Sequence, residues 1–344
     1  MFEELFGILL AVSTGALVVG VALIWDRRVR RQPALAAAAP DTGQGARELL
    51  KRVRRIEIAS RRTVNDQLAG SYHSIFKGRG MAFADVRPYA PGDEIRFIDW
   101  NVTARTGELH VKQFVEEREL TVFLAVDLSA SLDFGTRGRK KRELAAELAA
   151  MLAMSAMRNQ DKVGLITFTD RVETFLPPKK GRGQVLRVIR EVLAARAQGQ
   201  RTDFTEALKW LSQAAKRQAV VFLISDFAGA FCGPGGDAEE KALRTTARRH
   251  DLICMEVVDP LEEALPAVGL LEVRDAETGR RQVIDTTSAH VRQAYQMRLA
   301  DERAQRAERF RRLSVDHLVL HTGQDNQRTL VKFFATRARR AARG

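Results

Sequence analysis

Oxygen-bearing side chains occur in three segments of the sequence, next to the predicted ends of strands or the start of a helix. The motif "VDLSAS" places Asp127, Ser129 and Ser131 two residues apart behind an apolar run. Thr202 precedes a helical stretch in "QRTDFTEAL", and Asp226 closes a second apolar run in "FLISDF". Ligands of open α/β sheets bind outside the carboxyl ends of the strands. We therefore expect these five side chains to meet at one edge of a sheet.

Two carboxylates and three hydroxyls, with no histidine or thiolate nearby in the sequence, form a set of hard oxygen ligands. Mg²⁺ prefers oxygen ligands in near-octahedral geometry and is usually held by one or two carboxylates together with waters. The set predicts a Mg²⁺ site, with Mn²⁺ as the other candidate ion. Because hydroxyl ligands are neutral, a bound ion would keep surplus positive charge and could accept a carboxylate from outside.

Two other interpretations of these residues compete with the metal site. Ser, Thr and Asp are preferred helix caps, so Asp127, Ser129 and Ser131 could simply cap the next helix. The matching positions of Thr202 and Asp226 favour the metal site. Asp127 could also be the nucleophile of a Mg²⁺-dependent phosphohydrolase. Such an aspartate usually has a second Asp two residues later, where this chain has Ser129, so we expect a binding protein and not an enzyme.

Apolar runs and helical stretches alternate from about residue 121. Continuous Val/Ile/Leu/Phe runs are typical of strands buried on both faces of a parallel sheet. The predicted strands are 121–127, 162–169, 219–225, 252–258 and 316–321, and the predicted helices are 139–158, 183–196, 203–216, 237–250, 289–313 and 326–341. A hairpin is expected in "LLEVRDAETGRRQVIDT". The alternation predicts a doubly wound, mostly parallel α/β sheet.

The N-terminal region contains a long uncharged segment. Residues 5–25 have the length of a membrane-spanning helix, and the basic "DRRVRR" follows them. Positive-inside reasoning predicts a single pass in the inner membrane, with the N-terminus outside and the soluble domain in the cytoplasm. A cleaved signal peptide would need a basic n-region and a shorter apolar core. Residues 26–46 are a predicted linker, and 47–68 form a predicted amphipathic helix that lies on the membrane or packs on the domain.

The composition of the 344-residue chain limits its partners. The formal net charge is +13, but aromatic residues make up only 7%, and they are not interleaved with the basic residues as in single-strand binders. We therefore expect no nucleic-acid partner. The two cysteines, Cys232 and Cys254, are far apart, which indicates neither a zinc site nor a disulfide framework. Free thiols agree with a reducing compartment.

The spacing Asp-x-Ser-x-Ser, followed by a distant Thr and an Asp, resembles the metal-ion-dependent adhesion site of von Willebrand factor A domains. All five positions are present as Asp127, Ser129, Ser131, Thr202 and Asp226. The resemblance implies that the two serines and the threonine bind the ion directly, and that the aspartates do so directly or through water. It also implies that a carboxylate of a protein partner completes the coordination.

A longer segment, "GRGMAFADVRPYAPGDEIRFIDWNVTARTGELHVKQF" (residues 78–114), resembles the signature of the bacterial domain-of-unknown-function family 58. Further segments agree, among them "VGLITFTD", "PPKKGRG" and "ARRHDLICMEVVDP". The resemblance implies a small β-rich or irregular N-terminal extension, which is the signature region at 47–118, a von Willebrand factor A-like domain at 119–325 and a basic C-terminal helix at 326–344. It also implies a MoxR-type AAA+ ATPase as partner, in a chaperone-like or envelope-related system.

The signature region mixes arginines and acidic residues around two aromatic residues, Tyr89 and Trp100. Its balance of charge favours a structural clasp of ion pairs on the sheet edge. Because Arg and Trp are favoured interface anchors, a partner-docking surface is the alternative. The residues expected to serve one of these two roles are Arg87, Arg96, Asp99, Trp100 and Arg105.

Overall fold

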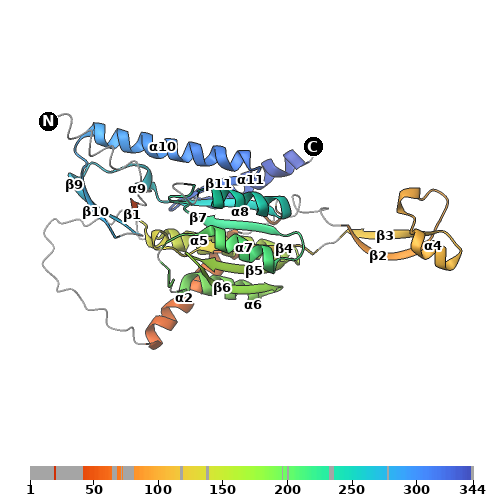
Figure 1. The fold of residues 1–344 in the computed structure, drawn as a ribbon. Helices are drawn as coiled ribbons and strands as arrows, with labels where there is room; N and C mark the ends of the chain where they lie inside the picture. The colour runs from red at the N-terminus through yellow and green to blue at the C-terminus, as the bar shows by residue number, and fades with distance from the viewer. Residues whose placement is uncertain are drawn as a thin grey trace.

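A six-stranded sheet forms the centre of the computed structural model (Figure 1). The model describes residues 19–20, 42–63, 68–70, 72, 81–116, 119–136, 139–195, 197–199, 201–231, 236–276 and 279–341. The sheet has the order β11-β8-β7-β4-β5-β6, and all neighbours are parallel except β5 and β6. Its strands are β4 (Thr121–Asp127), β5 (Lys162–Phe168), β6 (Val172–Lys179), β7 (Val220–Ser225), β8 (Asp251–Val258) and β11 (Asp316–His321).

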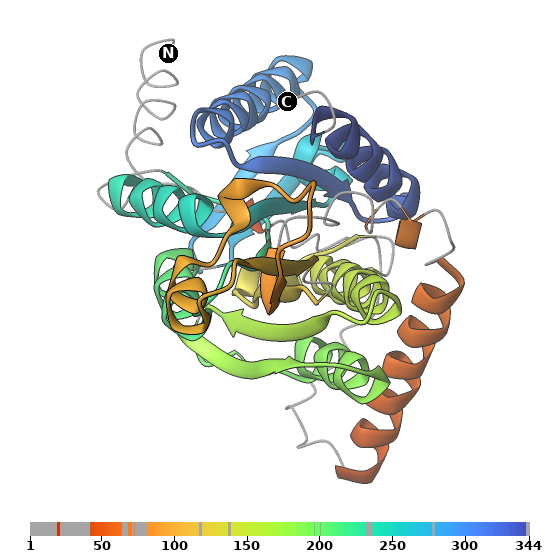
Figure 2. The same ribbon diagram turned by 90° about the vertical axis from the view of Figure 1, so that its right-hand side faces the viewer.

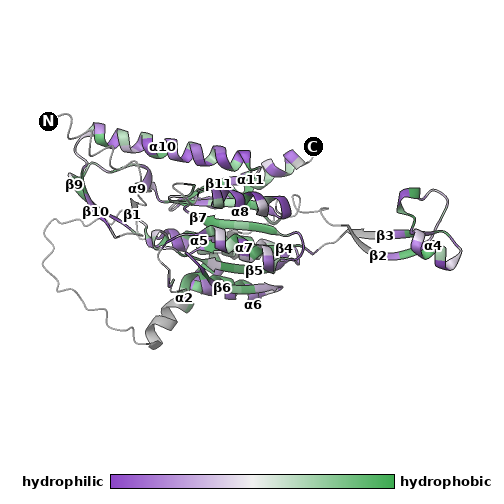
Figure 3. Cartoon of the chain, viewed as in Figure 1, coloured by the Kyte–Doolittle hydropathy of each residue, from purple (hydrophilic) through white to green (hydrophobic). Residues whose placement is uncertain are grey.

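Helices cover both faces of this sheet, which confirms the predicted doubly wound α/β class (Figure 2). Along β4, Leu124 and Val126 pack toward α5 and α6, while Phe123 and Ala125 pack toward α7 and α8. This alternation follows from the two-residue period of a strand, and both faces are apolar because both are buried. Figure 3 shows the apolar strands between helices of mixed polarity. These four helices are α5 (Lys141–Arg158), α6 (Arg182–Ala194), α7 (Phe204–Ala214) and α8 (Gly236–Arg249).

Strand β6 was not expected from the sequence. It contains Pro177 and Pro178 and lies at the edge of the sheet, paired with β5 in the antiparallel sense. Proline cannot donate to a ladder of hydrogen bonds, so an edge strand is where it is tolerated. The edge position therefore explains why the apolar pattern was too weak to identify this strand.

Helix α2 (Thr42–Thr63) begins earlier than the amphipathic helix expected at 47–68, inside the stretch expected to be a linker. It contacts α5 and α6. Val53 and Ile56 are buried in the core on that face of the sheet, while Leu50 and Ile58 are exposed. Of the two predicted positions for this helix, the structure thus shows packing on the domain.

Helices α10 (Ala289–Arg312) and α11 (Asn326–Ala341) follow the predicted boundaries within one residue. Helix α10 places Phe310 in one face of the core, and α11 places Leu330 and Phe334 in the other. The basic C-terminal helix is therefore one of the layers that cover the sheet. The predicted hairpin is also present, as β9 (Leu270–Asp275) paired with β10 (Arg281–Asp285) behind the short helix α9 (Pro260–Glu263).

The signature segment forms a separate arm that stands away from the central domain in Figure 1. Its strands β2 (Met81–Pro88) and β3 (His110–Glu116) pair with each other, in a two-stranded sheet of their own. The tip of the arm carries the 3₁₀ turn η1 (Ile95–Phe97) and helix α4 (Trp100–Thr106). The clasp expected on the edge of the main sheet is therefore confined to this arm.

The predicted membrane span, residues 5–25, lies outside the described residues except for Val19 and Gly20. These two residues form the short strand β1 (Val19–Gly20), which pairs with β9 and is not helical. Among the helices that the structure describes, none has both the length and the apolar character required to cross a bilayer.

Candidate metal centre at the carboxyl edge of the sheet

Asp127 lies at the end of β4, between β5 and β7, and its side chain is fully buried. Its Oδ1 accepts a hydrogen bond from the Ser129 amide at 2.8 Å. Its Oδ2 accepts from the hydroxyl of Ser225 at 2.6 Å and from that of Thr202 at 3.3 Å. No ion pair joins Asp127 to a lysine, arginine or histidine of the described residues. Burial and the nearby charge of Asp226 raise the pKa of Asp127 to about 6, although the hydrogen bonds oppose this shift.

The two serines follow β4 through a single 3₁₀ turn, η2 (Ala130–Asp133). Ser129 occupies the N-cap position of this turn, but its hydroxyl makes no capping hydrogen bond. It lies 3.0 Å from the Ser131 hydroxyl instead, and both side chains are buried. A capping role would direct the Ser129 hydroxyl to a backbone amide, so this geometry gives more support to the ligand interpretation.

Thr202 comes to the same place from the loop before α7. The Asp203 amide donates to the Thr169 carbonyl at the end of β5, at 2.9 Å. The Asp203 side chain then caps α7 by accepting from the Thr205 amide at 2.8 Å. These two bonds fix the loop at the carboxyl edge of the sheet, with Thr202 directed toward Asp127 and Asp203 used as a cap.

Asp226 follows β7 and is bonded from two sides. Its Oδ1 accepts from the Ala228 amide at 3.1 Å. Its Oδ2 accepts from the ammonium of Lys141 at 2.8 Å. Burial alone would raise the pKa of Asp226, but Lys141 outweighs that effect and holds the pKa below its ordinary value. The second carboxylate of the site is thus ionised and already paired with a cation.

The structure therefore brings all five predicted residues together at the carboxyl edge of the sheet, contributed by three segments of the chain. Within the described residues, no group of three or more His, Cys, Asp or Glu side chains is arranged to hold a metal ion. A cation at this edge would thus depend on the hydroxyls as well as on the two carboxylates. The donor set is all oxygen, and Asp127 is a buried carboxylate without a cation partner there. Both properties fit a small, hard divalent ion.

Sequence reasoning missed three residues at this site. Ser225 was overlooked because it precedes the more conspicuous Asp226. Lys141 was hidden in the basic run "RKKR", although its spacing from the buried Leu144, Ala145 and Leu148 places it on the inward face of α5. Glu262 accepts from Lys141 at 2.6 Å and also belongs to the capping box of α9. Its position could not be deduced without the tertiary fold.

The residues predicted for the clasp serve different roles in the arm. Arg87 binds Asp93 through two hydrogen bonds of 2.7 Å each. Asp99 caps α4 by accepting from the amides of Asn101 and Val102. The others are exposed: Arg96 pairs with Glu94 and lies over the Phe97 ring, Trp100 begins α4, and Arg105 lies in the last turn of that helix. The arm thus contains both structural pairs and free surface.

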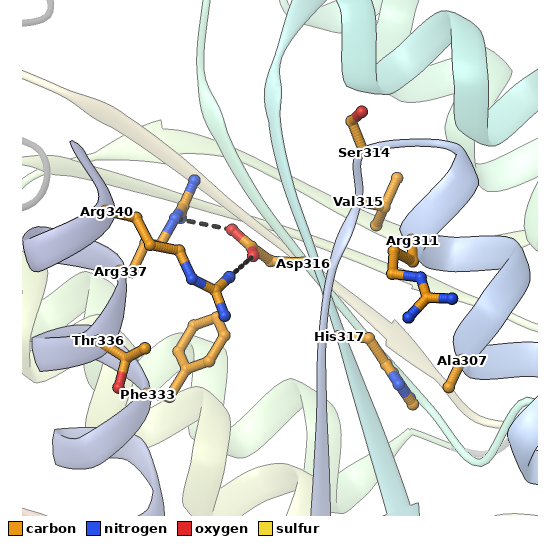
Figure 4. Close-up of a pocket in the computed structure, with 10 residues that line it drawn as sticks. All are labelled: Ala307, Arg311, Ser314, Val315, Asp316, His317, Phe333, Thr336, Arg337 and Arg340. Carbon is orange, nitrogen blue, oxygen red and sulfur yellow. Dashed lines mark ion pairs between the residues drawn. The ribbon is translucent and has the colours of Figure 1, made fainter. Parts of the chain in front are cut away.

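A cavity of about 410 Å³ lies between α10, β11 and α11 (Figure 4). Three arginines line it, but Asp316 projects among them and pairs with Arg337 at 2.8 Å and with Arg340 at 3.6 Å. Asp316 begins β11, whereas Asp127 ends the parallel strand β4, so the cavity lies toward the opposite edge of the sheet. Because its charges are already partly compensated, this cavity is a weaker candidate than the strand-end site.

Comparisons with known proteins agree with the family suggested by the signature segment. The model of a family described as "Protein of unknown function DUF58" matches residues 85–305. An uncharacterized protein of Mycobacterium tuberculosis is 33% identical over 300 residues, which are 86% of this chain and 92% of that protein.

Two solved structures are more distantly similar. The conserved hypothetical protein BatB from Bacteroides thetaiotaomicron is 17% identical with a TM-score of 0.42, over 64% of this chain and 99% of that one. A von Willebrand factor type A protein from Catenulispora acidiphila is 12% identical with a TM-score of 0.34, over 66% of this chain and 43% of that one.

Proposed function

We propose, from the premise that this chain belongs to the DUF58 family, that it is a protein-binding module whose Mg²⁺ site captures an acidic side chain of a partner. One observation carries the proposal. Asp127 is a fully buried carboxylate without a cation partner in the described residues, and it accepts hydrogen bonds from the hydroxyls of Thr202 and Ser225. An isolated buried carboxylate is unfavourable, and a divalent cation would compensate it.

Each residue has a distinct part in this proposal. Ser129, Ser131 and Thr202 would offer neutral hydroxyl oxygens to the ion, and the two aspartates would supply the negative charge. When bound, the ion supplies a positive centre with open coordination for an outside carboxylate. Ser225 holds Asp127 through its 2.6 Å hydrogen bond and is itself fixed by accepting from the Phe227 amide at 3.0 Å. Ser225 is therefore a positioning residue.

The proposed partner and location come from the family resemblance. A MoxR-type AAA+ ATPase is the proposed owner of the captured carboxylate, in a chaperone-like or envelope-related system. We further propose that residues 5–25 anchor the chain in the inner membrane and leave the described domain in the cytoplasm. The uncharged length of that segment and the basic residues after it support this arrangement.

The geometry gives less support to a phosphohydrolase. An aspartyl nucleophile must reach its substrate, but Asp127 is fully buried, and both of its oxygens accept hydrogen bonds. The position two residues later is Ser129, whose hydroxyl faces Ser131. Capture of a carboxylate needs none of these groups to react.

Calorimetric titration of Mg²⁺ and Mn²⁺ into the purified chain tests the metal site. We expect one ion per wild-type chain and no binding by Asp127→Ala. Asp161→Asn is the matched control, because Asp161 is also a buried aspartate but lies at the opposite edge of the sheet, where it accepts from the Leu120 amide and the Tyr72 hydroxyl. The control should bind metal as the wild type does. Equal binding by Asp127→Ala, or no binding by the wild type, would refute the site.

A further inference from the structure

Lys141 is the most deeply buried cation near the site. It occupies the first position of α5, and its side chain is 1% exposed. Its ammonium lies 2.8 Å from Asp226 and 2.6 Å from Glu262, so it bridges two carboxylates. Lysines are almost never fully buried unless they are paired, and this pairing connects directly to a proposed metal ligand. The location calls for an explanation beyond the stability of the domain.

The two neighbouring carboxylates, Asp226 and Glu262, act on the pKa of Lys141. Burial would lower the pKa of Lys141, but Asp226 and Glu262 outweigh it and raise the pKa above its ordinary range. Burial and the charge of Asp226 raise the pKa of Glu262, which the ammonium only partly opposes. The contacts with Asp226 and Glu262 therefore favour the ammonium form of Lys141.

Asp226 interacts with both the proposed ligand set and Lys141. Ser131, a member of that set, favours the ionised form of Asp226, and the Lys141 ammonium donates to its Oδ2 at 2.8 Å. Lys141, Asp226 and Glu262 also line a cavity of about 100 Å³, which leaves room for water beside the ammonium. A metal ion bound by Asp226 would thus share that carboxylate with a fixed cation.

We propose that Lys141 sets the metal affinity of the strand-end site, because its ammonium competes with the divalent ion for the charge of Asp226. The inference rests on the proposed function, since it assumes that the ion binds there. A weakened hold by the protein leaves the ion more electropositive toward the carboxylate of a partner. Lys141 is accordingly a positioning residue that lowers the metal affinity of the site and strengthens the attraction of the bound ion for a partner's carboxylate.

Substitutions at the two partners grade the local charge. Lys141→Met makes the surroundings of Asp226 more negative by one unit, and Glu262→Gln makes them less negative by one unit. The double variant restores the overall charge but removes the nearer cation. A neighbouring cation changes the proton affinity of an aspartate by about 10- to 1000-fold, and metal binding to the same oxygens is opposed in the same sense. We expect Lys141→Met to tighten metal binding by about tenfold or more.

The test measures Mn²⁺ affinity by titration with detection of the free ion by electron paramagnetic resonance, and by calorimetry. The expected order, from tightest to weakest, is Lys141→Met, the double variant Lys141→Met/Glu262→Gln, wild type and Glu262→Gln. A lysine with only a structural role would lower the unfolding temperature without tightening metal binding. Affinity of Lys141→Met equal to or weaker than wild type, in a folded variant, overturns the inference.

Two outcomes separate this inference from the proposed function. Binding by Lys141→Met but not by wild type would support the competition and contradict a working metal site in the natural chain. The absence of binding in every variant would overturn both. Should Lys141→Met fail to fold, the double variant decides: tighter binding than wild type supports the inference, and equal or weaker binding contradicts it.

Discussion

The carboxyl edge of the sheet and the projecting arm both carry acidic side chains in specific hydrogen bonds, but they use them differently. In the arm, Asp93 is paired with Arg87, and Asp99 caps α4 and pairs with Lys112 at 3.9 Å, so each of these acids has a cation partner within the arm. At the sheet edge, Asp127 has hydroxyl and amide partners but no ion pair with a described residue. Asp226 has one cation, Lys141, from a different part of the chain.

This difference separates structural acids from a candidate ligand. Acids that are compensated locally stabilise a turn or a helix and leave nothing for a further ion to neutralise. A buried acid without a cation leaves charge that a ligand can neutralise. The proposed metal site is therefore at the sheet edge, whereas these acids of the arm stabilise the arm itself. The substitutions below test this assignment, beginning with the largest expected effect.

Glu256 tests whether a buried acid with cationic partners stabilises the central domain, as the paired acids stabilise the arm, without contributing to metal binding. It is buried and accepts hydrogen bonds from Arg306 at 2.7 Å and from His317 at 2.9 Å. Glu256→Ala would leave Arg306 in a mostly buried position without this partner, so we expect a loss of about 3–5 kcal/mol in unfolding free energy. Denaturant unfolding measures it, and metal affinity should stay unchanged. A change in metal affinity without loss of stability would contradict the rule.

The pH dependence of the same residue has a defined sign. Burial would raise the pKa of Glu256, but His317 and Arg306 outweigh it and hold the pKa below its ordinary value. The stability it contributes is therefore present above the unfolded pKa, about 4.3, and is lost as pH falls through the lower folded value. The loss of stability on acidification should be smaller in Glu256→Ala than in wild type. Identical acid unfolding profiles would contradict this account.

Mg²⁺ itself should stabilise the domain through Asp127. A ligand that binds only the folded state adds about 2.7 kcal/mol at one hundred times its dissociation constant. We expect this increment in wild type and in Arg87→Ala, whose change is confined to the arm. We expect none in Asp127→Ala. Thermal unfolding with and without Mg²⁺ provides the measurement, and stabilisation of Asp127→Ala would break the comparison.

The serine hydroxyls should have a smaller effect. Ser129→Ala removes one neutral ligand, and we expect about a tenfold weaker Mn²⁺ affinity, which is about 1.4 kcal/mol. Ser155→Ala is the matched control, because Ser155 is also fully buried but bonds the Met151 carbonyl within α5. Calorimetric titration of both variants separates a ligand from an ordinary buried serine. Equal affinities would remove Ser129 from the ligand set.

The smallest expected effect lies in the arm. Asp99→Ala removes the cap of α4, and loss of an N-cap costs about 1 kcal/mol. The effect should be confined to the arm, and hydrogen exchange of the α4 amides would report it. Metal affinity should match wild type. A loss of metal binding in Asp99→Ala would show that the arm contributes to the site after all.

Most of the fold could be predicted because its signals are local and strong. The strands of the parallel sheet are uninterrupted apolar runs, and β4 and β11 have the predicted boundaries. The edge strand β6 was missed because its prolines and charged residues weaken the apolar pattern of a strand. Its antiparallel pairing with β5, which stabilises it, is seen only in the folded structure. The separation of the arm was also missed, because the sequence does not show which element its strands pair with.

The site was predictable as a set of positions but not as an electrostatic environment. Spacing and strand ends predicted that Asp127, Ser129, Ser131, Thr202 and Asp226 would meet, and the structure brings them together. The pairing of Asp226 with Lys141 depends on the first residue of α5 lying beside the residue that follows β7, which no local pattern specifies. Lys141 is one of four consecutive basic residues, and only its helical spacing from the buried residues of α5 distinguishes it from the other three. Charge partners that are distant in sequence therefore require the structure.

Affinity capture of a purified MoxR-type ATPase by the full chain tests the central claim most directly. The chain is immobilised in three forms, wild type, Asp127→Ala and Asp161→Asn, with Mg²⁺ or with a chelator. The account predicts capture by wild type and by Asp161→Asn in Mg²⁺, and no capture in chelator or by Asp127→Ala. Undiminished capture by folded Asp127→Ala, or capture that persists in chelator, would contradict a metal-mediated contact at the strand-end site.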